Sequence, residues 1–215
     1  MPIEFVKRYQ NKEIFPVRRL IVGLTGATGS ILGIRLLEAL KQSDVETHLV
    51  VSNWARRTLE HETPYTLAQV SALANVCHNT ANMAAEISSG SFLTEGMVVI
   101  PCSMRTLGSI AHGTGENLVH RAADVVLKER RKLVLVTRET PLSELHLENM
   151  LKLARMGAMI VPPMPAFYNK PKSIDDIVNH IVARVLDQFN ISAPFAKRWD
   201  GQMDNSARTA LVVNG

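Results

Sequence analysis

The stretch that decides the fold is Gly23-Leu-Thr-Gly-Ala-Thr-Gly29, which joins a short apolar run to a longer apolar-periodic one. Residues 20–22 (Leu-Ile-Val) precede it and suit a buried β-strand, whereas residues 31–40 carry apolar side chains at helical spacing. The stretch therefore predicts a strand–loop–helix unit. Its loop offers backbone N–H groups, two hydroxyls and the positive end of a helix dipole, which together suit a phosphate. A tight turn without a ligand explains the same residues, and that reading stays open at this point.

Composition limits the class of protein. A chain of 215 residues with 46% hydrophobic and 20% charged residues fits one domain with a sizeable core. Its apolar runs, such as residues 97–100, are too short to span a bilayer. Scattered positive charges, a net charge of +4 and only 5% aromatic residues favour anionic small molecules over nucleic acid as ligands. Cys77 and Cys102 form no CxxC pair and the N-terminus lacks an apolar signal core, so we expect a cytoplasmic, disulfide-free protein.

Strand-like and helix-like segments alternate along the chain and predict a doubly wound, parallel α/β domain over residues 19–190. An N-terminal extension (1–18) and a C-terminal tail (191–215) flank it. We expect about five core strands, at 19–24, 45–51, 96–101, 133–136 and 158–161. Helices are expected at 29–42, 66–74, 117–132, 143–156 and 174–189. Two more are expected, one that begins near residue 54 and one that follows residues 103–106 and ends near residue 111.

Polar residues follow each predicted strand at its carboxyl end, where ligands bind in such sheets. Because these ends meet at one rim, we expect a cleft rich in hydroxyls, N–H groups and cations. The second strand ends in Ser52-Asn53, where a dinucleotide site would need an acid, so a mononucleotide is the better ligand. The strand-end segments are 25–28, 52–53, 103–106, 138–139 and 163–168.

Eight segments of the chain resemble the UbiX/Pad flavin prenyltransferase family, and the resemblance extends from residue 19 to about 200. It implies a flavodoxin-like homo-oligomer, usually a dodecamer, with active sites at subunit contacts. The segments are 23–29 (GLTGATG), 46–52 (ETHLVVS), 87–92 (ISSGSF), 101–106 (PCSMRT), 121–130 (RAADVVLKER), 138–142 (RETPL), 162–168 (PPMPAFY) and 184–189 (RVLDQF).

The resemblance also implies an activity. Members of the family join the dimethylallyl group of dimethylallyl phosphate to N5 and C6 of reduced FMN, release phosphate and require no metal. A separate UbiD-type decarboxylase then uses the prenylated FMN. The resemblance implies FMN contacts for Gly26, Ala27, Thr28, Ser52, Ser103, Met104, Arg105, Thr106 and Arg138. It places Tyr168 and Arg184 on the prenyl phosphate, Arg121, Lys128 and Glu139 around it, and Trp199 in a tail that closes over the site.

The chemistry of these side chains suits the implied reaction. Lys128, Arg121, Arg184 and the Tyr168 hydroxyl would stabilise the charge that grows on the departing phosphate. Glu139 is then the candidate acid/base. The same residues also have plain structural explanations, as surface charges, a strand-end ion pair or packing. Cys102 is best explained as a small buried residue.

Two other functions remain open from the sequence, and one class of site is not expected. An FMN-dependent decarboxylase acting directly on a carboxylic acid would use a similar flavin loop. A non-catalytic flavin carrier would need none of the phosphate-binding set. The seven histidines show no HExxH motif or paired ligand spacing, so the sequence predicts no metal site.

Overall fold

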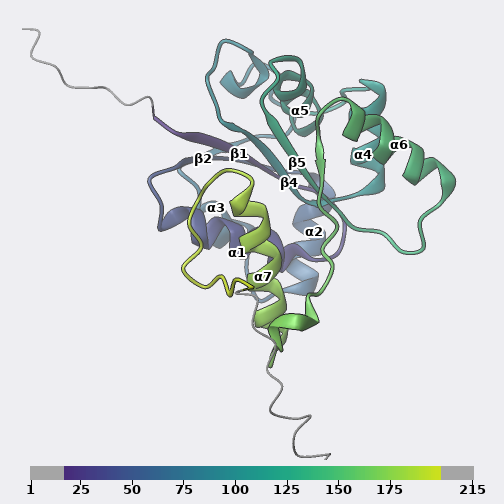
Figure 1. The fold of residues 1–215 in the computed structure, drawn as a ribbon. Coiled ribbons are helices and arrows are strands. Elements are labelled where there is room, and N and C mark those ends of the chain that lie inside the picture. The colour runs from purple at the N-terminus through teal and green to yellow at the C-terminus, as the bar shows by residue number, and fades with distance from the viewer. Residues whose placement is uncertain (1–16, 200–215) are drawn as a thin grey trace, which may run out of the picture.

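A six-stranded parallel sheet forms the centre of the structure, a computed structural model that describes residues 17–199 (Figure 1). The strand order is β3-β2-β1-β4-β5-β6, and every neighbouring pair is parallel. All seven residues of β4 are buried, so this strand is covered on both faces. The strands are β1 (Arg19–Leu24), β2 (Glu46–Val51), β3 (Val76–His78), β4 (Gly96–Cys102), β5 (Lys132–Thr137) and β6 (Met159–Ile160).

The sheet has its topological switch point at β1, which lies between β2 and β4. Ligands of open α/β sheets bind beyond the carboxyl ends of the strands at such a point. Without the short edge strand β3, the order β2-β1-β4-β5-β6 is the flavodoxin-like one. β3 is additional to the five strands expected. β3 has three residues, none of them fully buried. Its pairing with β2 defines it as a strand, and no apolar run marks it in the sequence.

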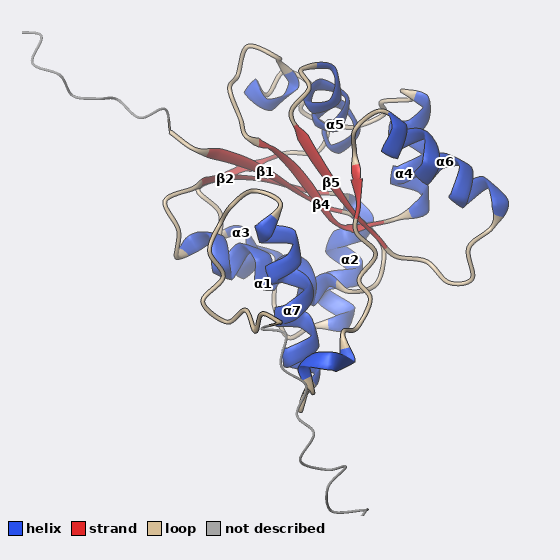
Figure 2. Cartoon of the chain, viewed as in Figure 1, coloured by secondary structure: helices blue, strands red, loops and turns tan. Residues whose placement is uncertain are grey.

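Helices cover both faces of the sheet (Figure 2). One core packs α1, α2, α3 and α7 on the face of β1 that carries Leu20 and Val22, and the other packs α4, α5 and α6 on the Ile21 face. α5 and α7 therefore lie on opposite faces. The helices are α1 (Ser30–Lys41), α2 (Asn53–Glu62), α3 (Leu67–Ser71), α4 (Met104–His112), α5 (Leu118–Lys128), α6 (Glu144–Arg155) and α7 (Ile174–Asp187), with short 3-10 helices η1 (Glu86–Ser88) and η2 (Phe167–Asn169).

Most predicted element boundaries are confirmed to within a few residues. The main difference is α5, which ends at Lys128 instead of 132, because Arg130 turns the chain with a φ of +57° and Lys132 already begins β5. Gly157 follows α6 with a φ of +99°, as expected of a helix C-terminus. Residues 1–16 and 200–215, which hold most of the predicted extension and tail, lie outside the described residues. Within the described range, no helix is long and apolar enough to cross a membrane.

Candidate functional site

The carboxyl ends of β1, β2 and β4 border a cavity of about 350 Å³. Five of the nine residues predicted to bind the cofactor line it, so the structure brings together strand-end loops that are far apart in the sequence. These five are Gly26, Ser52, Ser103, Arg105 and Thr106. Arg105 reaches across to Glu116, which lines the same cavity, with an N–O distance of 3.3 Å.

Three helices begin at this cavity. Ser52, Ser103 and Asn117 are the N-caps of α2, α4 and α5, and each side chain accepts a hydrogen bond from the third residue beyond it, at 3.1, 3.3 and 3.2 Å. All three caps line the cavity. Helix N-termini carry partial positive charge and unpaired N–H groups. The cavity is therefore suited to an anionic ligand such as a phosphate.

Thr25 joins two of the loops that form this cavity. Its hydroxyl donates to the Pro101 carbonyl at 2.7 Å and accepts from the Ser103 N–H at 2.9 Å. The side chain is buried. Thr25 thereby fixes the end of β4 and the start of α4 against the glycine-rich loop, whereas the sequence analysis counted its hydroxyl among the groups suited to a phosphate.

At the N-terminus of α1, the N–H groups of the glycine-rich loop bind a side chain of the protein and not the phosphate that its sequence predicts. Glu62, the last residue of α2, accepts hydrogen bonds from the Gly29 N–H at 2.9 Å and the Ser30 N–H at 3.0 Å. Burial acts to raise the pKa of Glu62, but hydrogen bonds from Thr28, Ser30 and Gly29 outweigh it, and the pKa is lowered. The positive end of α1 thus already faces a carboxylate. Gly26 lines the cavity, whereas Ala27 is buried, so the FMN contacts of Ala27 and Thr28 stay predictions.

Two polar atoms at the cavity lack partners within the described part of the chain. They are Thr80 Oγ1 and His120 Nδ1, both buried. Burial lowers the pKa of His120, which favours the neutral imidazole. Unpaired buried polar groups are costly, so these atoms indicate that a polar ligand completes the site. FMN, with its many ring, ribityl and phosphate oxygens and nitrogens, fits that requirement.

Sequence reasoning placed Asn53 at the rim of the cleft but missed five other cavity residues. Trp54, at the start of α2, is 63% exposed and stacks with Arg57, whose guanidinium carbon lies 5.2 Å from the ring centroid. The Leu118 N–H donates to the Thr80 carbonyl at 2.8 Å, which holds Thr80 at the start of α5. The five are Trp54, Thr80, Glu116, Asn117 and His120.

Two other predicted cofactor residues are not among the residues that line the cavity. Met104 is half-buried and packs against the core on the α4–α5 face. The backbone N–H of Arg138 donates to the Cys102 carbonyl at 3.1 Å, which ties the end of β5 to that of β4. Cys102 is fully buried, and burial raises the pKa of its thiol to about 12, which confirms its reading as a small buried residue. The FMN contacts of Met104 and Arg138 stay predictions.

Two of the predicted phosphate-site cations lie on α5 beside the loop of residues 88–92. Arg121 donates to the Ser88 carbonyl at 3.2 Å and to Asp124 at 2.8 Å. Lys128 pairs with Glu129, and its Nζ lies close to Gly90. Both side chains are thus grouped along one helix. Glu139 is exposed beyond β5, where its carboxylate accepts from the Thr140 N–H at 3.1 Å.

Tyr168 and Arg184 share a second cavity, of about 380 Å³, on the α7 side. Trp199 also lines it and contacts Tyr168 edge to face, with ring centroids 5.7 Å apart. Lys197 and Arg198 add positive charge, while Asp187 pairs with Arg184 and Arg198 at 2.7 Å each. The prediction that these residues act together is consistent with this shared, basic cavity. The closing role of Trp199 stays a prediction.

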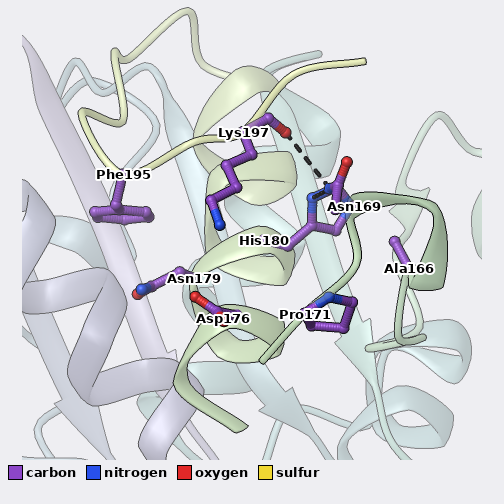
Figure 3. A pocket seen from close by; sticks show the side chains of 8 residues that line it. All are labelled: Ala166, Asn169, Pro171, Asp176, Asn179, His180, Phe195 and Lys197. Carbon is purple, nitrogen blue, oxygen red and sulfur yellow. Dashed lines mark hydrogen bonds between the residues drawn. The ribbon is translucent and has the colours of Figure 1, made fainter. Parts of the chain in front are cut away.

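A smaller hollow adjoins this basic cavity. Figure 3 shows Asn169 beside His180 of α7 and hydrogen-bonded to the backbone carbonyl of Lys197. Asn169 Nδ2 lies 2.8 Å from His180 Nδ1, and the other ring nitrogen lies 3.5 Å from the Tyr168 hydroxyl. His180 therefore links the 3-10 helix that carries Tyr168 to α7.

The predicted phosphate-site residues therefore form separate groups in one chain, because α5 and α7 cover opposite faces of the sheet (Figure 2). A doubly wound parallel sheet, with a polar cavity at its switch point and helix N-termini around it, defines a flavodoxin-like, mononucleotide-binding α/β protein.

Comparison with known proteins gives the family. The model of the family "Flavoprotein" matches residues 8–186. A "Probable UbiX-like flavin prenyltransferase" of Streptomyces sp. (strain D7) is 64% identical over 193 residues, which are 89% of this chain and 96% of the relative. The chain therefore belongs to the flavoproteins and, among them, to the UbiX-like flavin prenyltransferase family.

Two solved structures resemble the chain closely. The structure of AnUbiX (PadA1) in complex with FMN and dimethylallyl pyrophosphate has a TM-score of 0.85 at 54% identity, covering 86% of this chain and 99% of that one. A dodecameric FMN-dependent Ubix-like decarboxylase from Escherichia coli O157:H7 has a TM-score of 0.84 at 64% identity, covering 85% and 100%. Both support the flavodoxin-like fold.

Proposed function

We propose that this protein is a flavin prenyltransferase that joins a dimethylallyl group from dimethylallyl phosphate to N5 and C6 of reduced FMN and releases phosphate. The observation that carries the proposal is the switch-point cavity with its two unpaired polar atoms, Thr80 Oγ1 and His120 Nδ1, in a chain of this family. AnUbiX, which shares the fold, holds FMN together with a dimethylallyl pyrophosphate. The prenylated FMN would pass to a UbiD-type decarboxylase.

The cavity at the switch point would hold the flavin nucleotide. Reduced FMN supplies the nucleophilic ring atoms that accept the prenyl group. Ser52, Ser103 and Asn117 present the positive ends of three helices, and Arg105 adds an exposed cation beside them. These groups suit the FMN phosphate and ribityl chain, while Thr80 and His120 offer hydrogen bonds to its polar atoms.

The phosphate of the second substrate requires a separate set of residues. Tyr168 and Arg184 would bind it in the basic cavity on α7, and Arg121 and Lys128 would stabilise its growing charge without a metal ion. Glu139 would move the proton that the flavin ring loses. Because α5 and α7 lie on opposite faces of one chain, we propose that neighbouring subunits complete each centre. The Escherichia coli O157:H7 relative is described as dodecameric, which supports a homo-oligomer.

The direct test is anaerobic incubation of the purified chain with reduced FMN and dimethylallyl phosphate, followed by mass analysis of the flavin. We expect a gain of one dimethylallyl unit. Glu139→Gln and Lys128→Ala should slow it strongly, while Lys152→Ala, an exposed cation of α6, serves as the matched control. Unchanged rates in both site variants would contradict these assignments. A parallel reaction with the pyrophosphate identifies the leaving group.

Sharing of the site between subunits can be tested by mixing two inactive variants. Oligomers of Arg121→Ala alone or Arg184→Ala alone should have little activity. If the two residues meet across a subunit contact, mixed oligomers contain some centres with both residues intact and regain activity. If both residues of a centre come from one chain, mixing restores nothing, and the shared-site proposal fails.

The same assay separates the alternatives. Release of CO₂ from an aromatic acid by the purified chain alone would favour a decarboxylase, the name given to the Escherichia coli O157:H7 relative. Retention of FMN with no change in its mass would favour a flavin carrier.

Two free cysteines, one of them exposed, support the proposed cytoplasmic location, where thiols stay reduced.

A further inference from the structure

Two histidines and a glutamate meet at the β3 edge of the sheet, outside the residues assigned to either substrate. His48 lies in β2, His78 ends β3 and Glu86 begins η1. The parallel register places His78 beside Val50, two residues after His48, so both imidazoles project from the same face of the sheet. One ring nitrogen of each histidine and one carboxylate oxygen of Glu86 all lie within 4.8 Å of one another.

The two imidazoles face each other through their nitrogens. His48 Nδ1 lies 3.0 Å from His78 Nε2, and the ring planes differ by only 13° with centroids 5.3 Å apart. A hydrogen atom on one of these nitrogens fills the space between them. Glu86 Oε1 lies 3.9 Å from the same Nδ1. Two nitrogens and an oxygen are therefore concentrated around one small volume.

Glu46 prepares His48 for a further ligand. Its carboxylate lies 2.9 Å from His48 Nε2 and accepts from Arg19 Nε at 2.8 Å. A carboxylate at Nε2 keeps a proton on that nitrogen, so Nδ1 carries a lone pair that faces His78 and Glu86. Metal-binding histidines commonly have such a carboxylate on their other nitrogen. Phe92 packs edge to face on the ring, with centroids 5.1 Å apart, and gives the site an apolar wall.

We propose that His48 Nδ1, His78 Nε2 and the Glu86 carboxylate form a binding site for a divalent transition metal of the zinc type, with water completing the coordination. Two imidazoles and one carboxylate suit Zn²⁺ and are poor ligands for Ca²⁺ or Mg²⁺. The ion replaces the hydrogen between the rings. The His48 side chain is 2% exposed and stays fixed, whereas Glu86 is 47% exposed and His78 ends an edge strand, so these two can turn toward the ion.

The position of the site indicates a structural role. The ion would tie β2 and β3 to η1, which leads directly into the loop of residues 88–92. The carbonyls of Ser88, Gly90 and Phe92 in that loop accept hydrogen bonds from Arg121 and Arg131 on the α5 side. The metal would hold this loop in place without taking part in prenyl transfer. The proposal departs from the sequence prediction of no metal, which rested on local spacing.

The test uses the full chain without a polyhistidine tag, stripped by a chelator and dialysed. Zn²⁺ is titrated in competition with a chromophoric chelator, and Co²⁺ is added separately to record visible absorption. We expect one Zn²⁺ per chain and Co²⁺ bands of a nitrogen- and oxygen-ligated ion. Glu86→Gln and His78→Gln should each weaken Zn²⁺ binding by about tenfold or more. His61→Gln, an exposed histidine of α2, should bind like the wild type.

Thermal melting provides a second readout. Zn²⁺ should raise the melting temperature of the wild type and of the His61→Gln control, and leave Glu86→Gln and His78→Gln unchanged. Both site variants replace side chains that are not fully buried, so their folding is expected to survive. No stoichiometric binding by the wild type, or equal affinity in the wild type and both site variants, would overturn the proposal.

Discussion

Replacing Thr25 by valine should loosen the cavity at the switch point. The substitution keeps the shape of the side chain and removes one hydroxyl. That hydroxyl donates to the Pro101 carbonyl at 2.7 Å and accepts from the Ser103 N–H at 2.9 Å. The Pro101 carbonyl keeps a second donor, the Thr25 N–H at 3.3 Å, so most of the cost arises at the Ser103 N–H.

A partly buried N–H left without an acceptor costs about 1–3 kcal/mol, so we expect the free energy of unfolding to fall by about 2 kcal/mol. For a chain of this size that corresponds to a melting temperature lower by about 4–8 °C. FMN affinity should fall as well, because Ser103 caps α4 at the cavity and would lose its fixed position. Both quantities can be measured at one protein concentration, by thermal melting and by flavin fluorescence titration.

Two control variants test whether the Thr25 hydroxyl itself causes the loss of stability and FMN affinity. Thr25→Ser keeps the hydroxyl and should retain most of the stability and FMN affinity. Thr94 has a buried hydroxyl oxygen with no partner within the described residues, so Thr94→Val should cost little or even stabilise the protein. If Thr25→Val were as stable and bound FMN as tightly as Thr25→Ser, the hydroxyl bridge would not be what holds the two loops together.

Gly26, His120 and Cys77 each affect a property that one substitution can test. Gly26→Ala places a Cβ 2.5 Å from Trp54 Cβ, and the resulting strain costs about 1–3 kcal/mol. We expect FMN binding, measured by fluorescence titration, to weaken about tenfold or more. Gly115→Ala is the control, because a Cβ there has nothing within 4 Å, and it should leave FMN binding unchanged. Burial lowers the pKa of His120, so as the pH falls the unfolded state takes up the proton before the folded state does. The free energy of unfolding should therefore fall as the pH drops below about 6.5. In urea melts, His120→Gln should show a shallower fall than the wild type. Ellman's reagent should modify one thiol, the exposed Cys77, in the folded protein and both in denaturant, and Cys77→Ser should show none while folded.

The sheet and half of its cavity could be predicted because their signals are local. Apolar runs followed by hydroxyl residues mark β1, β2 and β4, and parallel strands bring their carboxyl ends to one rim. Ser52 and Ser103 were found in this way, and both also cap the helices that follow. Binding and capping need the same residue types at the same positions, so one pattern predicts both.

The rest of the cavity depends on long-range contacts that no local pattern encodes. Thr80 comes from a segment without periodicity, and it reaches the cavity because β3 pairs with β2 and because its carbonyl binds the Leu118 N–H. His120 lies in the first turn of α5, where only the packing of that helix turns it inward. His48 and His78 lie 30 residues apart and show no motif in the sequence, yet the pairing of β2 with β3 places both rings together.

The glycine-rich loop shows how far a local motif can be interpreted. Its sequence predicts phosphate at the N-terminus of α1, but Glu62 from α2 accepts the hydrogen bonds of Gly29 and Ser30 there. A phosphate at those N–H groups would have to displace the Glu62 carboxylate, whose pKa is lowered, and both anions cannot share the position. The loop therefore acts on the site through its first half. Thr25 ties it to the start of α4, and Gly26 permits its close approach to α2, so that the free positive ends at the cavity are those of α2, α4 and α5.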